Sequence, residues 1–72
     1  MGYWYDIYIG DEQEPWNRDV PLLKEQAYRE ADRLYADGWS VCVIRMEEDG
    51  GEVRETKRTY WPPKHEKEVR RS

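Results

Sequence analysis

The chain of 72 residues has no phenylalanine, a single cysteine and a single histidine. One cysteine excludes an intramolecular disulfide, and one Cys with one His makes a poor ligand set for zinc. No apolar run approaches the roughly 20 residues that cross a bilayer, and the start of the chain lacks a signal-peptide pattern. We therefore expect a cytoplasmic protein that does not contact membranes, with Cys42 as a buried structural thiol.

Motifs that carry catalysis are also missing. The sequence has no glycine-rich phosphate loop, no H-E-x-x-H helix and no nucleophile elbow. Cys42 lies in the most apolar stretch and His65 in a charged one, so they do not suggest a nucleophile with its base. We expect that the protein is not an enzyme and that it uses no cofactor or metal.

Tryptophan and tyrosine take the place of phenylalanine, with four Trp and six Tyr. These rings have an apolar body and a polar tip that needs a hydrogen-bond partner or water, and they are enriched at binding hot spots.

The net charge of −4 is unevenly spread. Residues 1–50 carry twelve acids and five bases, a net charge of −7, whereas residues 51–72 carry four acids and seven bases, a net charge of +3. This asymmetry predicts an acidic body with a basic tail.

Hydrophobic periodicity predicts three strands and one helix. Residues 3–9, 39–46 and 52–61 are rich in β-branched and aromatic side chains, and residues 47–51 form a hairpin loop with an Asp-Gly turn. A helix is expected over residues 20–37, with Asp19 as its N-cap and Gly38 as the left-handed residue that ends it. Its buried stripe is predicted to contain Leu23, Ala27, Ala31 and Leu34.

The order β-α-β-β predicts an α+β fold, in which one helix packs on a three-stranded mixed sheet. A right-handed crossover would make the first two strands parallel. The apolar second strand favours the spatial order 1-2-3, and 1-3-2 is the alternative. We expect residues 1–61 to form this domain and residues 62–72 to be a basic tail, either disordered or one short helix.

One face of such a sheet has no helix to cover it. Alternation along the first strand turns Tyr5 and Ile7 toward the helix and Trp4 and Tyr8 away from it. If Val41 and Val43 also face the helix, then Cys42, Ile44 and Met46 lie on the open face. An exposed apolar and aromatic patch on a monomer marks an interface. The alternatives are that the tail or a second copy of the chain covers this face.

Acidic side chains gather in two loops, which a parallel second strand would bring to the same end of the sheet. They would form a negative rim that selects a partner with a basic surface. The sequence thus predicts a small protein-interaction module, a regulator or inhibitor of the kind that phages also direct against host proteins. The predicted anchors are Trp4, Tyr8, Trp16 and Trp61, and the predicted rim is Asp11, Glu12, Glu14, Glu48 and Asp49.

Two other functions fit the same sequence. Basic and aromatic residues interleave in the last third of the chain, as they do in proteins that bind single-stranded nucleic acid or RNA. The residues of this alternative are Arg54, Arg58, Tyr60, Trp61, Lys64, Arg70 and Arg71. The other alternative is a structural homodimer in which two sheets join by their faces or edges.

Overall fold

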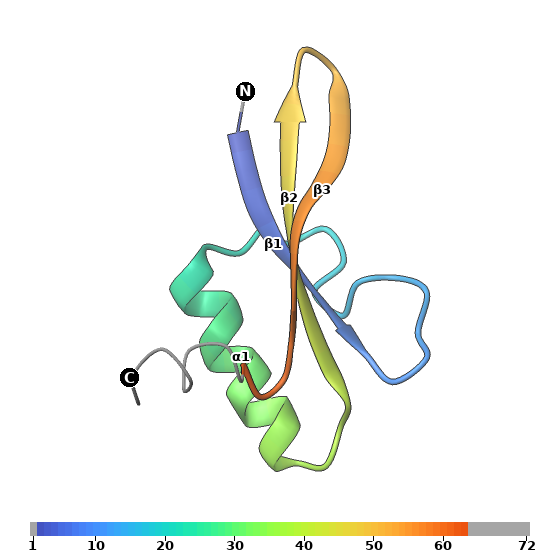
Figure 1. Ribbon diagram of the computed structural model, residues 1–72, viewed down its shortest axis with the longest axis vertical. Coiled ribbons are helices and arrows are strands. Elements are labelled where there is room, and N and C mark those ends of the chain that lie inside the picture. Colours follow the sequence, from blue (N-terminus) through green and yellow to red (C-terminus); the bar gives the residue numbers. More distant parts are fainter. Residues whose placement is uncertain (1, 64–72) are drawn as a thin grey trace, which may run out of the picture.

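The computed structural model describes residues 2–63, which form one helix packed on one face of a three-stranded sheet (Figure 1). The elements are β1 (Gly2–Ile9), α1 (Lys24–Ala36), β2 (Val41–Asp49) and β3 (Glu52–Tyr60). The predicted α+β class and the order β-α-β-β are confirmed. A two-residue turn, Gly50-Gly51, joins β2 to β3, and both glycines have the positive φ angles that such a hairpin requires.

The spatial order of the strands is β1-β2-β3, as predicted, but every neighbouring pair is antiparallel. In the first pair Ile9 lies opposite Val41, and Gly2 lies opposite Glu48. The predicted mixed sheet with a parallel crossover is therefore wrong. The reason lies in the path that the chain takes before the helix.

After β1 ends, residues 10–23 turn back and run along the outer edge of β1. The backbone N–H of Trp16 donates to the carbonyl of Ile7, and that of Tyr5 donates to the carbonyl of Leu22 at 2.9 Å. The helix thus starts beside the middle of β1 and runs in the same direction as β1 (Figure 1). It returns the chain to the far end of β1, where β2 must begin in the antiparallel sense.

Asn17 holds this returning segment against β1. Its side-chain oxygen accepts the backbone N–H of Ile7 at 2.9 Å, and its side-chain nitrogen donates to the carbonyls of Tyr5 at 3.2 Å and Val20 at 2.7 Å. Asn17 is itself buried. One amide side chain therefore satisfies backbone groups that a neighbouring strand would otherwise pair.

The helix begins later than the sequence indicates. Its N-cap is Leu23, not Asp19, because residues 20–22 stay extended while Leu22 bridges to Tyr5. The side-chain oxygen of Gln26 accepts the backbone N–H of Leu23 at 3.0 Å, which satisfies one donor at the start of the helix. Leu23 is 65% exposed, so its predicted place in the buried stripe is wrong. Gly38 does adopt the expected left-handed conformation after the helix, with φ of 103°.

The core lies between α1 and the covered face of the sheet. The small side chains of Ala27 and Ala31 let the helix lie close to the strands, and Leu34 fills the far end of the interface. The strands contribute Tyr5, Ile7, Val41 and Val43. This pairing of an apolar helical stripe with alternate strand residues is the one that the periodicity predicts.

The end of the described chain is also packed against the helix. The indole ring of Trp61 contacts the ring of Tyr28 edge-to-face, with centroids 4.8 Å apart, and its N–H donates to a carboxylate oxygen of Asp32 at 2.8 Å. The predicted basic tail, apart from residues 62 and 63, lies outside the described residues. Within residues 2–63, no helix has the length and apolar character that a membrane span requires.

We predict that Asn17→Ala destabilises the protein. The substitution leaves the Ile7 N–H and the Tyr5 carbonyl without their partner at a buried edge, which costs roughly 2–3 kcal/mol. Urea unfolding measures the loss, with Gln13→Ala as the control, since Gln13 is exposed in the same segment. Equal stability of the two variants would contradict the role given to Asn17.

Candidate functional site on the open sheet face

The face of the sheet opposite α1 carries the residues that alternation predicts. Val41 and Val43 are buried under the helix, so Cys42, Ile44 and Met46 lie on the other side. A hollow of about 520 Å³ opens on this side. Its lining includes Tyr8 from β1, Cys42, Ile44 and Met46 from β2, Glu55, Arg58 and Tyr60 from β3, and Glu12 from the loop after β1.

A β-bulge in β3 determines which charged side chains reach this hollow. Arg45 pairs with Lys57, but the next residue of β2, Met46, pairs with Glu55. Thr56 is therefore an extra residue in β3, and the alternation of faces changes there. In a regular strand, Glu55 and Arg58 would point to opposite faces because they are three residues apart. The bulge places both on the open face.

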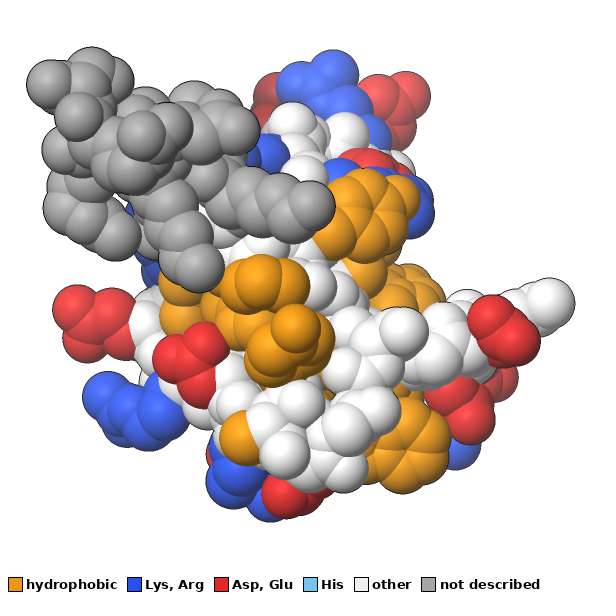
Figure 2. Space-filling view, turned by 60° about the horizontal axis from the view of Figure 1, so that its bottom comes forward, with side chains coloured by type: hydrophobic (Ala, Val, Ile, Leu, Met, Phe, Trp, Pro, Cys, Tyr) orange, Lys and Arg blue, Asp and Glu red, His pale blue; other side chains and the backbone are white. Residues whose placement is uncertain are grey.

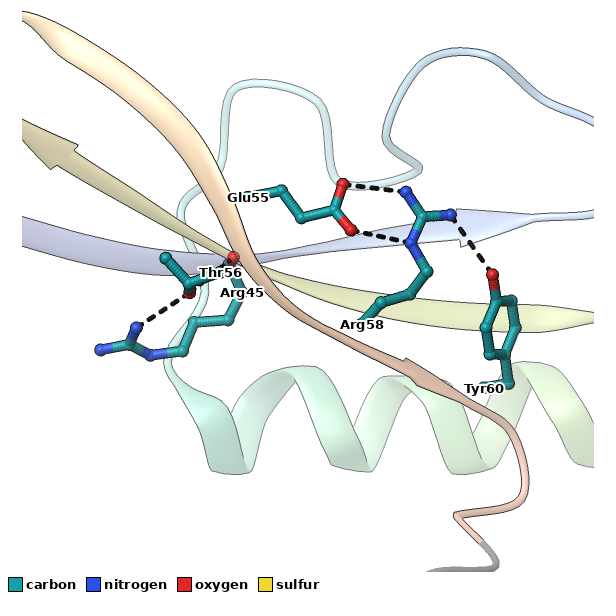
Figure 3. Close-up of polar contacts among 5 residues, drawn as sticks. All are labelled: Arg45, Glu55, Thr56, Arg58 and Tyr60. Carbon is teal, nitrogen blue, oxygen red and sulfur yellow. Dashed lines mark hydrogen bonds and ion pairs between the residues drawn. The ribbon is translucent and has the colours of Figure 1, made fainter.

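Glu55 and Arg58 form a two-pronged ion pair there (Figure 3). The arginine Nε and Nη2 donate to the two carboxylate oxygens of Glu55, each at 2.8 Å, and Nη1 reaches the hydroxyl of Tyr60 at 3.4 Å. The bonds to Arg58 lower the pKa of Glu55, and the bonds to Glu55 and Tyr60 raise the pKa of Arg58. The pair is solvated, so it orients side chains more than it stabilises the fold.

Thr56 fastens the bulge to β2 on the opposite side of the sheet from this ion pair. Its hydroxyl donates to the backbone carbonyl of Arg45 at 3.1 Å and accepts from the guanidinium of the same residue at 3.0 Å (Figure 3). The guanidinium of Arg45 in turn lies 4.2 Å from the ring centroid of Tyr3. One threonine side chain thus ties the irregular step in β3 to the neighbouring strand.

Asp6 is a carboxylate on the open side that is almost fully buried, at 8% exposed. Burial raises the pKa of Asp6, and hydrogen bonds from the side chains of Trp4 and Asn17 partly offset this effect. Trp4 also lines a small hollow with Arg18, Asp19 and Pro21 of the returning segment.

Two ionisable side chains that line the hollow, Cys42 and Tyr8, have raised pKa values. Burial raises the pKa of the Cys42 thiol, and the positive charge of Arg58 only partly opposes this. Burial, followed by the charge of Asp6, raises the pKa of Tyr8. The thiol of Cys42 and the phenol of Tyr8 therefore both keep their protons near pH 7.

The acidic loops do not form the rim that the sequence predicts. Because β2 is antiparallel to β1, Asp11, Glu12 and Glu14 lie at the end where β2 starts, whereas Glu48 and Asp49 lie beside the first residues of β1. The two groups are thus at opposite ends of the sheet (Figure 1). Of these five residues only Glu12 lines the hollow of the open face.

The four predicted aromatic anchors are also divided. Tyr8 lines the hollow and Trp4 lies on the same face, near the returning segment. Trp16 is 39% exposed, and the guanidinium of Arg33 in α1 lies 6.0 Å from its ring centroid. Trp61 packs on α1 through Tyr28 and Asp32. Trp16 and Trp61 therefore lie away from the open face, next to the helix.

A second hollow of about 530 Å³ lies where α1 ends and β2 begins, lined in part by Tyr35, Trp39, Tyr60 and Trp61. Figure 2, in which this end of the molecule comes forward, shows hydrophobic side chains reaching the surface among acidic and basic ones. Trp39 is 50% exposed and Tyr60 is 63% exposed. Tyr60 borders both hollows and is the most exposed aromatic side chain among the described residues.

The basic residues of the nucleic-acid alternative are not gathered on one surface. Arg54 lies on the face of the sheet that the helix covers, with its guanidinium 3.9 Å from the carboxylate of Glu47. Arg58 lies on the open face, in an ion pair with Glu55. Tyr60 is on the open face and Trp61 is against the helix. Lys64, Arg70 and Arg71 lie outside the described residues.

Sequence reasoning missed two residues that shape the site. Asn17 reads as an ordinary loop asparagine, and only its contacts reveal that it closes the edge of β1. Glu55 reads as a solvated charge, and its spacing from Arg58 argues against a contact until the bulge is known. Within residues 2–63, no group of three His, Cys, Asp or Glu side chains is placed to hold a metal ion.

Comparisons of this chain with protein-family models, with curated proteins and with solved structures give no match. We therefore infer function from the geometry of the site itself.

We predict that Asp6 makes stability depend on pH. A carboxyl group whose pKa is higher in the folded than in the unfolded state contributes stability at low pH, and this contribution is lost as the pH rises through the folded-state value. Compared with Asp6→Asn, the wild type should gain free energy of unfolding as the pH falls from about 7 to about 4. Urea titrations at several pH values measure the difference.

Asp11→Asn removes a carboxylate from the exposed loop and controls for the change in net charge. A constant difference between the wild type and Asp6→Asn across this pH range would contradict the burial assigned to Asp6.

Proposed function

We propose that the protein is a small protein-binding module, a regulator or inhibitor, whose open sheet face receives a side chain of a partner protein. The observation that carries this proposal is the hollow over β2, which combines an apolar floor with charged groups at its border. Binding sites of this size are typically apolar with a few placed polar groups.

The chemistry of the lining supports a basic partner side chain with an apolar stem. Cys42 and Met46 are half-buried and line the hollow beside the buried Ile44, so the methylene groups of a lysine or arginine can lie along the side chains of Cys42 and Met46. The charges of Arg58 and Glu55 offset each other. Glu12 also borders the hollow, and no ion pair within residues 2–63 offsets its negative charge. The hollow therefore favours a cation at the end nearest Glu12.

Tyr60 and Tyr8 supply the aromatic walls of the hollow. Tyrosine buries a large area at low cost in conformational entropy and can still hydrogen-bond through its hydroxyl, which suits a contact that is wet in the free protein. The Glu55 pair already holds Arg58 in place, so less ordering is needed when a partner binds.

The nucleic-acid alternative has weaker geometric support. Its described basic residues lie on two faces, and Arg54 and Arg58 are paired with acids. Binding of a labelled oligonucleotide that weakens steeply with salt would favour that alternative over the one proposed here.

We predict that Tyr8→Ala weakens partner binding at least about tenfold, because an anchor side chain of a hot spot contributes more than roughly 1.4 kcal/mol. Tyr3→Ala is the matched control: the same substitution on the same strand, with the side chain on the helix side of the sheet. Affinity capture with the wild type identifies the partner, and calorimetry with the purified partner measures the three affinities. A partner bound equally well by both variants would rule out the open face.

We predict that Glu12→Lys slows association with the same partner and makes its rate less sensitive to salt. Removal of a border charge acts mainly on the association rate. Glu14→Lys is the matched control, since Glu14 belongs to the same loop but does not line this hollow. Stopped-flow kinetics at low and high salt compare the two variants, and identical rates would contradict a cation beside Glu12.

A further inference from the structure

The two edges of the sheet differ in a way that the proposed function does not use. The outer edge of β1 is covered by residues 10–23, through Asn17 and the bridge between Tyr5 and Leu22. The outer edge of β3 has no such cover in residues 2–63, where β3 packs against β2 and no other helix or strand. An uncovered edge offers unpaired N–H and C=O groups to another strand.

The register shows which residues offer these groups. The backbone N–H of Ile7 and the backbone carbonyl of Tyr5 point away from β2, toward residues 10–23. Val43 lies opposite Ile7 in the antiparallel pair, so the backbone N–H and C=O of Val43 point away from β1 and toward β3. The bond from the Trp61 N–H to the Val41 carbonyl, 3.0 Å long, follows the same alternation. Thr59 lies opposite Val43, so the backbone N–H and C=O of Thr59 point toward β2.

Alternate residues of β3 consequently point their backbone groups outward. On the C-terminal side of the bulge these are Arg58 and Tyr60, and on the N-terminal side they are Glu55 and Val53. The side chains of these four residues all belong to the open face. Val53 and Tyr60 are 55% and 63% exposed and are the two exposed large hydrophobic residues of the strand.

This set of four residues is complementary to itself about a two-fold axis. With the axis between Thr56 and Lys57, an antiparallel copy of β3 places Glu55 opposite Arg58 of the second copy and Val53 opposite Tyr60 of the second copy. Each contact occurs twice, as two-fold symmetry requires. Opposite charges and an aliphatic side chain against an aromatic one are both favourable cross-strand pairs.

Charges and a bulge on an edge strand usually prevent pairing with other chains. Here they restrict pairing to one register instead. Registers that set Arg58 opposite Arg58, or Glu55 opposite Glu55, place like charges across the interface. The bulge makes Glu55 and Arg58 both outward residues, so a symmetric pairing with opposite charges is available only because Thr56 is present.

We propose that the partner of the β3 edge is a second copy of this chain, and that the two copies form one continuous antiparallel sheet through β3. The interface uses the outward backbone N–H and C=O groups of Val53, Glu55, Arg58 and Tyr60. On the open face, Glu55 of each copy lies opposite Arg58 of the other copy. The open faces of both copies then lie side by side on the same surface of the joined sheet, and both hollows over β2 remain accessible.

A charge-reversal experiment tests this register. Sedimentation velocity from micromolar to millimolar concentrations should show a monomer–dimer equilibrium for the wild type. Glu55→Arg and Arg58→Glu should each raise the dimer dissociation constant at least about tenfold, because symmetry repeats the repulsion at two positions. An equimolar mixture of the two variants should regain the dimer, since each position then meets an opposite charge.

The chain that carries both substitutions is the matched control, because it keeps the ion pair and the symmetric complementarity and should dimerise like the wild type. Val53→Pro removes an outward N–H, a change that a strand edge tolerates without loss of inward bonds. It should abolish the dimer while circular dichroism stays native, and Val53→Thr should not.

A wild type that is monomeric at every concentration would overturn the proposal. A dimer that is insensitive to Val53→Pro would also overturn it, since that dimer would use another surface. A mixture of the single variants that stays monomeric would overturn the register. Failure of this proposal can be told apart from failure of the proposed function, because sedimentation of the protein alone measures self-association and the partner-binding variants at Tyr8 and Glu12 lie outside β3.

Discussion

The hydrogen bonds between Asn17 and the outer edge of β1 constrain the rest of the fold. They hold residues 10–23 alongside β1, so the chain is already beside the middle of that strand when α1 begins. The helix must then run in the direction of β1, and β2 can only return antiparallel to it. Within residues 2–63, the same contacts cover one edge of the sheet, whereas the opposite edge, at β3, packs against no helix or strand other than β2.

The bulge at Thr56 is the second constraint. It leaves the strand order unchanged and determines which charged side chains of β3 share a face. One extra residue reverses the alternation of faces along β3, so Glu55 joins Arg58 on the open face while Arg54 moves to the helix side. The open face thereby gains an oriented ion pair next to an apolar floor. The two hydrogen bonds between Thr56 and Arg45 hold this step in place.

Contacts within the fold account for part of the abundance of tryptophan and tyrosine. The indole N–H of Trp61 donates to the carboxylate of Asp32, so its polar tip is used within the fold. Tyr28 completes the packing around Trp61. Tyr60 lies between two hollows and is 63% exposed, although its hydroxyl accepts a hydrogen bond from Arg58.

The sequence by itself determined the elements, their order in the chain and the two faces of β1 and β2, because burial follows a period of two along strands and 3.6 along helices. It thereby placed Tyr8, Cys42 and Met46 correctly on the open face. Strand direction, the late start of α1, the separation of the acidic loops and the Glu55–Arg58 pair were decided only by the tertiary structure. Each depends on contacts between distant segments, such as those of Asn17 with Ile7 and of Thr56 with Arg45, which local periodicity does not encode.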